Sequence, residues 1–155
     1  MIKAILSDFS KVCVFAKDEK YTGGLNSLHE ELLKEGDYDF WKYFSLNQEL
    51  LSFYKNKSKS IDIYVFTTKY IQDYPPIKDK IDGIFKDVFS GARLSIEKSN
   101  YESYNVIAKK IKLNSDEILF IDDNSKNVEA AKESGMQTIL YKSNKDVIAK
   151  ISQNI

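Results

Sequence analysis

Apolar residues occur along the chain in short, nearly continuous runs, separated by stretches in which they recur every three or four positions. A short apolar run is typical of a strand that is covered on both faces. Several of these runs end in polar residues, as expected where a strand meets a loop. The predicted strands are Ile2–Leu6, Ile61–Phe66, Glu117–Ile121, Gln137–Tyr141 and, from a shorter run, Asp87–Ser90.

The stretches between these runs have helical spacing. Their apolar residues fall on one face when they are placed at 3.6 residues per turn. Strands that alternate with such helices predict an α/β fold, in which a mainly parallel sheet is joined by crossover helices. The predicted helices are Leu46–Tyr54, Ile77–Phe85, Tyr101–Ile111, Val128–Ser134 and Val147–Ile151.

The segment of about residues 17–44 interrupts this alternation after the first strand. It contains a glycine pair, one helical stretch at Leu25–Leu33 and a cluster of aromatic residues. We expect a small cap insertion in a single domain of residues 1–155, placed as a lid over the strand ends. Its aromatic residues are more typical of packing than of ligand stacking. We expect His29 to lie on the surface and Cys13, among apolar neighbours, to be buried.

Charge and composition exclude some functions. The 23 basic residues balance the 23 acidic ones, so no overall charge favours nucleic acid or an anionic membrane. No stretch approaches the roughly 20 apolar residues that span a bilayer. Because a lone cysteine cannot form an internal disulfide and the first residues do not resemble a signal peptide, we expect a cytoplasmic location.

Polar residues follow three of the predicted strands. Asp8 follows the first strand, Thr67 and Thr68 the second, and Asp122 and Asp123 the third. Each alone could be a helix cap or a turn residue. In a parallel sheet, however, the carboxyl ends of the strands share one edge, where ligands bind.

These residue types suit phosphoryl transfer. Carboxylates that share one edge repel each other unless a cation lies among them, and Mg²⁺ prefers oxygen ligands. Thr67 and Lys98, which we expect at the start of a helix, could bind the oxygens of a phosphoryl group. Asp8 could then attack phosphorus. The sequence therefore predicts Mg²⁺ as cofactor and a small phosphorylated molecule as substrate.

The same positions resemble the four ordered motifs of the haloacid dehalogenase (HAD) superfamily. The motifs are Asp8 after an apolar strand, Thr67, Lys98, and the stretch 118–131, which continues through 135–139. The last stretch is the most specific. The resemblance implies a Rossmann-like three-layer fold with a short helical cap.

The resemblance also implies a role for each matching position. The magnesium ligands would be Asp8, the backbone carbonyl of Ser10, and Asp123, with Asp122 as a further ligand or an orienting group. Asp8 would also be the nucleophile. Thr67 and the amide of Thr68 would hold the phosphate, and Lys98 would neutralise charge between nucleophile and substrate.

Ser10 departs from the family pattern. Phosphatases of the family usually carry at this position an aspartate that protonates the leaving group and later activates water. A serine cannot do this near neutral pH, and a positioned acid or base usually contributes about 10²- to 10⁴-fold. We therefore expect a slow phosphatase. The alternatives are a non-catalytic binding or regulatory module and, less favoured, a dehalogenase, whose halide product leaves without a proton.

Overall fold

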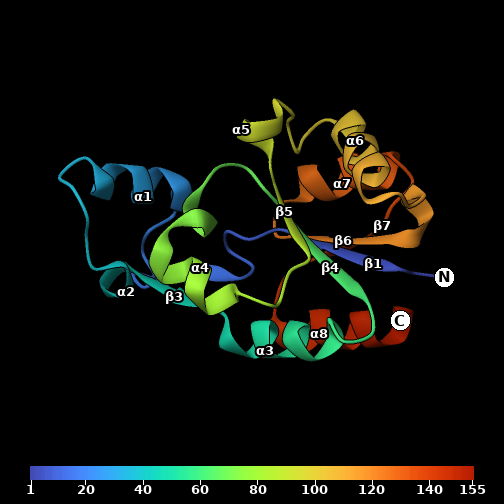
Figure 1. Ribbon diagram of the computed structural model, residues 1–155, viewed down its shortest axis with the longest axis horizontal. Coiled ribbons are helices and arrows are strands. Elements are labelled where there is room, and N and C mark those ends of the chain that lie inside the picture. Colours follow the sequence, from blue (N-terminus) through green and yellow to red (C-terminus); the bar gives the residue numbers. More distant parts are fainter.

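The computed structural model describes all residues, 1–155, and its centre is a five-stranded parallel sheet (Figure 1). The strand order is β5-β4-β1-β6-β7, and every neighbouring pair is parallel. The α/β fold predicted from the sequence is confirmed. The strands are β1 (Ala4–Ser7), β4 (Asp62–Thr67), β5 (Asp87–Ser90), β6 (Ile118–Asp122) and β7 (Gln137–Leu140).

Helices cover both faces of the sheet. On one face α3 (Gln48–Lys57) packs beside α8 (Asn144–Asn154), and on the other α6 (Tyr101–Ile111) packs beside α7 (Ser125–Glu133) (Figure 1). The short α5 (Gly91–Leu94) follows β5. Alternate residues of β1 point to opposite faces, so they enter two separate hydrophobic clusters. The molecule therefore has three layers with the sheet in the middle.

The remaining elements lie beyond one end of the sheet. They include α1 (Leu25–Leu33), α2 (Phe40–Tyr43) and an antiparallel pair formed by β2 (Val14–Ala16) and β3 (Phe44–Leu46). The 3₁₀ turn Ile71–Asp73 and α4 (Pro75–Ile81) follow β4 and lie against this insertion, while a second 3₁₀ turn, Ser115–Glu117, precedes β6. Leu25, Phe40 and Phe44 are buried in the same hydrophobic cluster as Ile5 and Ile63 of the sheet. The aromatic residues of the insertion thus pack against the sheet, as expected.

Four of the predicted helices have different bounds in the structure. The helix predicted at Leu46–Tyr54 begins at Gln48, because Leu46 pairs in β3 and the side chain of Asn47 caps the helix by accepting from Leu50 N. The helix predicted at Ile77–Phe85 ends at Ile81, just before Gly83, whose φ of 72° is left-handed. Helices α7 and α8 also begin earlier than predicted, at polar caps.

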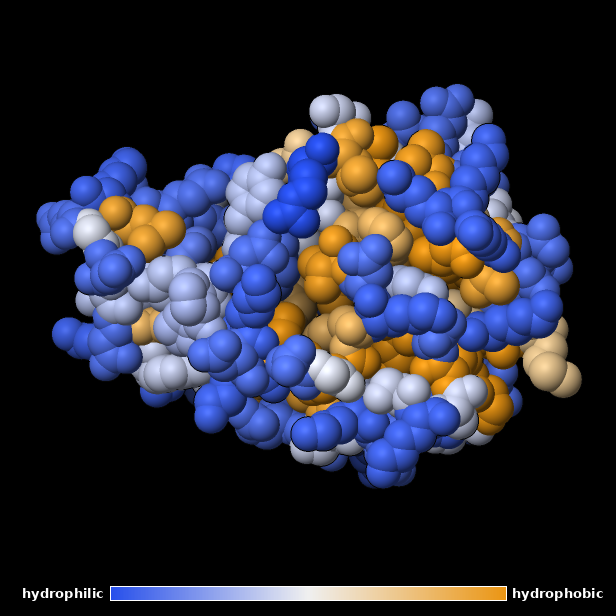
Figure 2. All heavy atoms as spheres, viewed as in Figure 1, coloured by the Kyte–Doolittle hydropathy of each residue, from blue (hydrophilic) through white to orange (hydrophobic).

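The surface divides into two parts in the view of Figure 2. Hydrophobic residues come to the surface mainly over the sheet, between the α6 layer and the α3–α8 layer, whereas the insertion end is mostly hydrophilic (Figure 2). Lys86, beside the edge strand β5, forms an exposed ion pair with Asp62. Charged side chains at an open edge discourage pairing with other strands. None of the helices has the length and apolar character that crossing a bilayer requires.

Candidate functional site

Strands β1 and β6 bring three aspartates together at the carboxyl edge of the sheet. Ser7 of β1 is in register with Ile121 of β6, and Asp8 N donates to Ile121 O at 2.7 Å. Because these strands are parallel neighbours, the residues that follow them meet. One carboxylate oxygen from each of Asp8, Asp122 and Asp123 lies within 4.8 Å of the others. The structure thus brings together the acidic residues that the sequence singled out.

Lys98 is the cation of this cluster. Its Nζ lies 2.6 Å from Oδ1 of Asp8 and 2.5 Å from Oδ2 of Asp122, and the residue is only 7% exposed. The ammonium also lies over the rings of Phe66 and Phe120, 5.7 and 5.9 Å from their centroids. An ammonium group can be buried when carboxylates pair with it, whereas burial of an unpaired ammonium would cost much free energy.

The backbone around Lys98 is fixed from α6. Lys98 does not begin this helix, contrary to the sequence prediction, because Asn100 caps it and Tyr101 is its first residue. Tyr104, one turn into α6, is fully buried, and its hydroxyl lies 2.7 Å from Lys98 O and 3.1 Å from Asn127 O. The aromatic residue six positions after the lysine therefore links the lysine loop to α7.

The oxygens of the carboxylates differ in what they already bind. Both oxygens of Asp122 are occupied: Oδ1 accepts from Asn124 N at 2.8 Å, and Oδ2 accepts from Asn127 Nδ2 at 3.1 Å and from Lys98. Oδ1 of Asp8 accepts from Lys98 and from Phe9 N at 2.7 Å. Oδ2 of Asp8 and the carboxylate of Asp123 bind no other side chain. The free oxygens therefore belong to Asp8 and Asp123.

The electrostatics of the cluster favour an added cation. Burial, together with the charges of Asp122 and Asp123, raises the pKa of Asp8 to about 7 despite the opposing effect of Lys98. Burial and the neighbouring Asp122 also raise the pKa of Asp123. For Lys98, burial acts to lower the pKa, but the two aspartates outweigh it and the pKa is raised. Lys98 therefore stays charged and offsets only part of the negative charge.

Two buried hydroxyls at the site have no partner. The Oγ1 of Thr67, the last residue of β4, and the Oγ of Ser10, two residues after Asp8, are buried without a hydrogen bond. Most buried polar groups in proteins are hydrogen-bonded, and an unsatisfied one costs stability. Both residues were predicted to belong to the site. Both hydroxyls are therefore available for a hydrogen bond with a ligand at this edge of the sheet.

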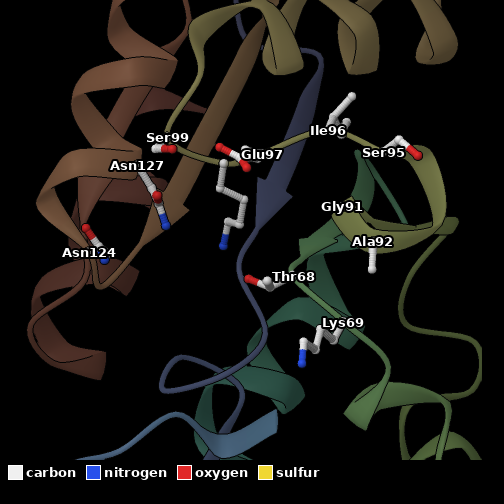
Figure 3. Close-up of a pocket in the computed structure, with 11 residues that line it drawn as sticks. Thr68, Lys69, Gly91, Ala92, Ser95, Ile96, Glu97, Ser99, Asn124 and Asn127 are labelled. Carbon is white, nitrogen blue, oxygen red and sulfur yellow. The ribbon is translucent and has the colours of Figure 1, made fainter. Parts of the chain in front are cut away.

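A hollow of about 660 Å³ opens beside Lys98. Thr68 and Lys69 line it on one side, and Asn124 and Asn127 of the β6–α7 region lie on the other (Figure 3). Most of its lining residues are polar, and Glu97 is the one carboxylate among them. A polar ligand that reaches the lysine would therefore meet hydrogen-bonding groups on both sides.

The loop that carries Asp8 and Ser10 is held from α3. The Nδ2 of Asn47 donates to Val12 O at 2.8 Å, and Asn47 N donates to Cys13 O at 2.8 Å. Within the loop, Lys11 has a left-handed φ of 61°. Cys13 is buried as expected. Asn47 and Asn127 are the site-supporting residues that sequence reasoning missed, since Asn47 follows the unpredicted strand β3 and Asn127 lies inside α7.

The insertion is fastened to the segment after β4, so it borders the site. Glu30 of α1 pairs with Lys69 at 2.8 Å, and Asn26 accepts from Ile71 N at 3.1 Å. His29 is 6% exposed, and its Nδ1 lies 2.7 Å from the hydroxyl of Tyr38. The expectation that His29 lies on the surface was wrong, because helix α1 turns this side chain toward the aromatic cluster.

This donor set fits a hard divalent cation. Mg²⁺ prefers oxygen ligands and usually takes one or two carboxylates from a protein. The free oxygens of Asp8 and Asp123 supply such ligands, while Asp122 is already engaged by its neighbours. The acidic cluster can therefore bind a metal.

Comparisons with known proteins agree with this architecture. Residues 26–141 match the family model of the haloacid dehalogenase-like hydrolases. The chain is 35% identical over 92 residues to enolase-phosphatase E1 of Aquifex aeolicus, a match that covers 54% of this chain and 39% of that protein. The chain thus spans about two-fifths of that relative's length.

Solved structures show the same fold. A HAD family enzyme of Bacteroides thetaiotaomicron, crystallised with magnesium and inorganic phosphate, superposes with a TM-score of 0.69 at 14% identity, covering 93% of this chain and 96% of that one. A HAD-like family hydrolase of Porphyromonas gingivalis gives 0.70 at 15% identity, covering 99% and 98%. With the family match over most of its length, the chain belongs to the haloacid dehalogenase-like hydrolases.

Proposed function

We propose that this protein is a magnesium-dependent phosphatase that acts through an aspartyl-phosphate on Asp8, on a small phosphorylated substrate and at a low rate. The observation that carries the proposal is the state of Asp8. One of its oxygens is fixed by Lys98 and Phe9 N, and the other is free beside Asp123. A carboxylate that is held on one side and open on the other is oriented for nucleophilic attack.

The residues around Asp8 have separate tasks in this proposal. The free oxygen of Asp8 would attack phosphorus, and the bond from phosphorus to the leaving group would break. The unpartnered hydroxyl of Thr67, with the amide of Thr68, would bind the phosphoryl oxygens. Lys98 would offset the charge of the nucleophile and of the phosphoryl group. Water would then release phosphate from Asp8.

The metal would be held by Asp8, Asp123 and the carbonyl of Ser10. When bound, Mg²⁺ would neutralise phosphoryl charge and orient the substrate. Asp122, whose oxygens are already occupied, would serve to position Lys98 and the α7 N-terminus rather than to bind the ion. Of the four metal ligands predicted from the sequence, we therefore propose three, Asp8, Ser10 and Asp123, and assign Asp122 as the orienting group.

The names of similar proteins support a phosphatase. The curated relative is an enolase-phosphatase, and one structural neighbour was solved with magnesium and inorganic phosphate. The substrate of that relative does not transfer to this chain, because the match spans 39% of its length. The proposal therefore names the reaction and leaves the substrate as a small phosphate ester or anhydride.

Substitution of the nucleophile tests the proposal. Asp8→Asn should abolish magnesium-dependent release of phosphate from a panel of generic phosphate compounds, because the amide cannot form the intermediate. Asp18→Asn is the matched control, since Asp18 is exposed in the loop after β2. If both variants retain the rate of the wild type, Asp8 is not the nucleophile.

Ser10 favours a second candidate, a non-catalytic module that binds magnesium and a phosphorylated ligand. Ser10 cannot protonate a leaving group as the usual aspartate does, so the protein could bind magnesium and a phosphorylated ligand without hydrolysing it. Such a module would be stabilised by magnesium and phosphate through mass action. It would show neither turnover nor a phosphorylated Asp8 with any phosphate compound in the panel.

A further inference from the structure

We propose that the substrates of this site are phosphoryl donors whose leaving group departs as a stable anion, such as acyl phosphates, phosphoanhydrides or activated aryl phosphates, and that the phosphoryl group then accumulates on Asp8. This inference rests on the proposed function. It follows from the lack of a proton donor at the place where a leaving group would depart.

Ser10 is the first reason. It follows Asp8 by two positions, and its Oγ is buried without any hydrogen-bond partner. No neighbouring base could draw a proton from this hydroxyl, and no acid could pass one through it. A serine hydroxyl does not ionise near neutral pH, so Ser10 can neither protonate a leaving group nor activate water.

The other buried groups near Asp8 cannot replace this acid. Lys98 is held by two carboxylates, and losing its proton would leave both of them unpaired. The hydroxyl of Tyr104 is directed to backbone carbonyls, and burial raises its pKa far above the ordinary value. Asp122 has both oxygens occupied by hydrogen-bond donors, so it has no proton to give.

The carboxylate of Asp123 lies within 4.8 Å of that of Asp8, but in the proposed function it binds the metal and therefore carries no proton to give. The other carboxylates lie at the rims. Glu97 lines the hollow beside Lys98, while Asp18 and Glu19 line a second hollow, of about 820 Å³, that also includes Lys11 and Tyr21. All three carboxylates are exposed. No packing or hydrogen bond holds any of them toward Asp8, and general acid catalysis requires a proton donor within hydrogen-bond reach of the departing atom.

The chemistry then divides into an easy and a difficult step. In the first step Asp8 bonds to phosphorus, and the leaving group departs with the electron pair of the broken phosphorus–oxygen bond. A carboxylate, phosphate or activated phenolate carries that pair without a proton, whereas an alkoxide does not. In the second step water attacks phosphorus, Asp8 is released, and the proton of the water passes to solvent or phosphate without a positioned base. The second step should therefore be slow.

A leaving-group series on the unmodified protein tests the inference. We would measure the rate with magnesium for substituted phenyl phosphates of graded leaving-group basicity, for acetyl phosphate and for glycerol phosphate. We expect a steep fall in rate as the leaving group becomes more basic, a burst with the best donors, and a phosphorylated Asp8 peptide by mass spectrometry after acid quench. Glycerol phosphate should give the lowest rate.

Three outcomes would overturn the inference. A flat series with turnover dependent on Asp8 would show that a proton donor exists, and the proposed function would stand without the inference. A flat series in wild type that becomes steep in Glu97→Gln would identify Glu97 as that donor. An absence of both turnover and Asp8 phosphorylation with every donor would overturn the inference together with the proposed function.

Substitution of Ser10 sharpens the test. Ser10→Asp should raise the rate on glycerol phosphate by about 10²-fold or more, flatten the series and shorten the lifetime of the phosphorylated protein. Ser10→Ala is the matched control and should leave the series as steep as in wild type. A folded Ser10→Asp protein with an unchanged series would count against the inference. If this variant does not fold, the wild-type series decides alone.

Discussion

The two sides of Asp8 differ in how far their polar atoms are satisfied. On the side of β6, the oxygens of Asp122 are filled by Lys98, Asn124 N and Asn127. On the other side, the buried hydroxyls of Ser10 and Thr67 bind nothing. In the first group, which we call the framework, Lys98, Asp122, Asn124 N and Asn127 satisfy one another's polar atoms. In the second group the hydroxyls have no partner without a ligand, and this contrast indicates where the phosphoryl group would bind.

We expect the largest effect on stability from removing the cation of the framework, Lys98. Lys98→Met would leave Asp8 and Asp122 without their buried cation, so we expect a loss of about 3–5 kcal/mol in the free energy of unfolding, measured by urea denaturation, and loss of activity. Lys86→Met is the control, because Lys86 pairs with Asp62 at the exposed edge of the sheet. Equal stability losses in the two variants would show that Lys98 does not carry the framework.

The second prediction concerns pH and magnesium. The pKa of Asp8 is about 7 in the folded protein against an ordinary 3.8, so without metal the native state binds more protons than the unfolded state between these values. The stability that Asp8 contributes is therefore present below the lower value and is lost as pH rises through about 7. This pH-dependent contribution can be measured as the difference in the free energy of unfolding between wild type and Asp8→Asn across this pH range.

Magnesium should reverse this dependence, because the ion must displace the proton of Asp8 to bind. We expect a larger rise of the melting temperature with magnesium at about pH 8 than at about pH 5. The Asp8→Asn variant should show little rise at either pH. A magnesium effect that is the same at both pH values in wild type would mean that the ion binds elsewhere.

The third prediction concerns the unpartnered hydroxyl of Thr67. Thr67→Val keeps the shape but removes a buried hydroxyl without a partner, so the free protein should become more stable by about 1 kcal/mol. Binding of phosphate in the presence of magnesium, followed by calorimetry, should weaken about tenfold, since a hydrogen bond to a charged group contributes about 1.5 kcal/mol. Thr138→Val, in the middle of β7, is the control for phosphate affinity. Unchanged affinity in Thr67→Val would place the phosphate elsewhere.

We expect the smallest effect from His29 in the insertion. Its contribution to stability should change with pH in the direction opposite to that of Asp8. Burial lowers the pKa of His29, so the folded protein favours the neutral ring. The stability contributed by His29 is present above the ordinary value of 6.5 and is lost as pH falls through the lower folded pKa. His29→Gln should reduce this acid-side loss in urea denaturation. A parallel loss in wild type and variant would contradict the assignment.

Much of the fold could be predicted from the sequence, because buried strands and helices leave strong periodic patterns. The strands of the sheet and the meeting of Asp8 with Asp122 and Asp123 follow from apolar runs and parallel topology. The three-residue strands β2 and β3 could not be predicted, since they are too short for a pattern and pair across a long separation. The burial of His29 likewise depends on distant aromatic partners.

The candidate site could be predicted only at the level of which residues meet. Whether Asp122 or Asp123 has free oxygens depends on contacts with Asn124 and Asn127, which spacing does not reveal. The unpartnered state of Thr67 and Ser10 is also a property of the packed structure. The sequence thus indicated which residues meet, and the structure separates those whose polar atoms are satisfied from those whose polar atoms are free.

One measurement tests the central claim most directly, a crystal structure of the protein soaked with Mn²⁺, as a visible substitute for Mg²⁺, and phosphate. We expect the ion between the free oxygens of Asp8 and Asp123, the phosphate against Thr67 and Lys98, and Asp122 still bound by Asn124 and Asn127. A crystal in which Asp8 and Asp123 bind no ion, and in which the hydroxyl of Thr67 remains unpartnered at saturating ligand, would contradict the account.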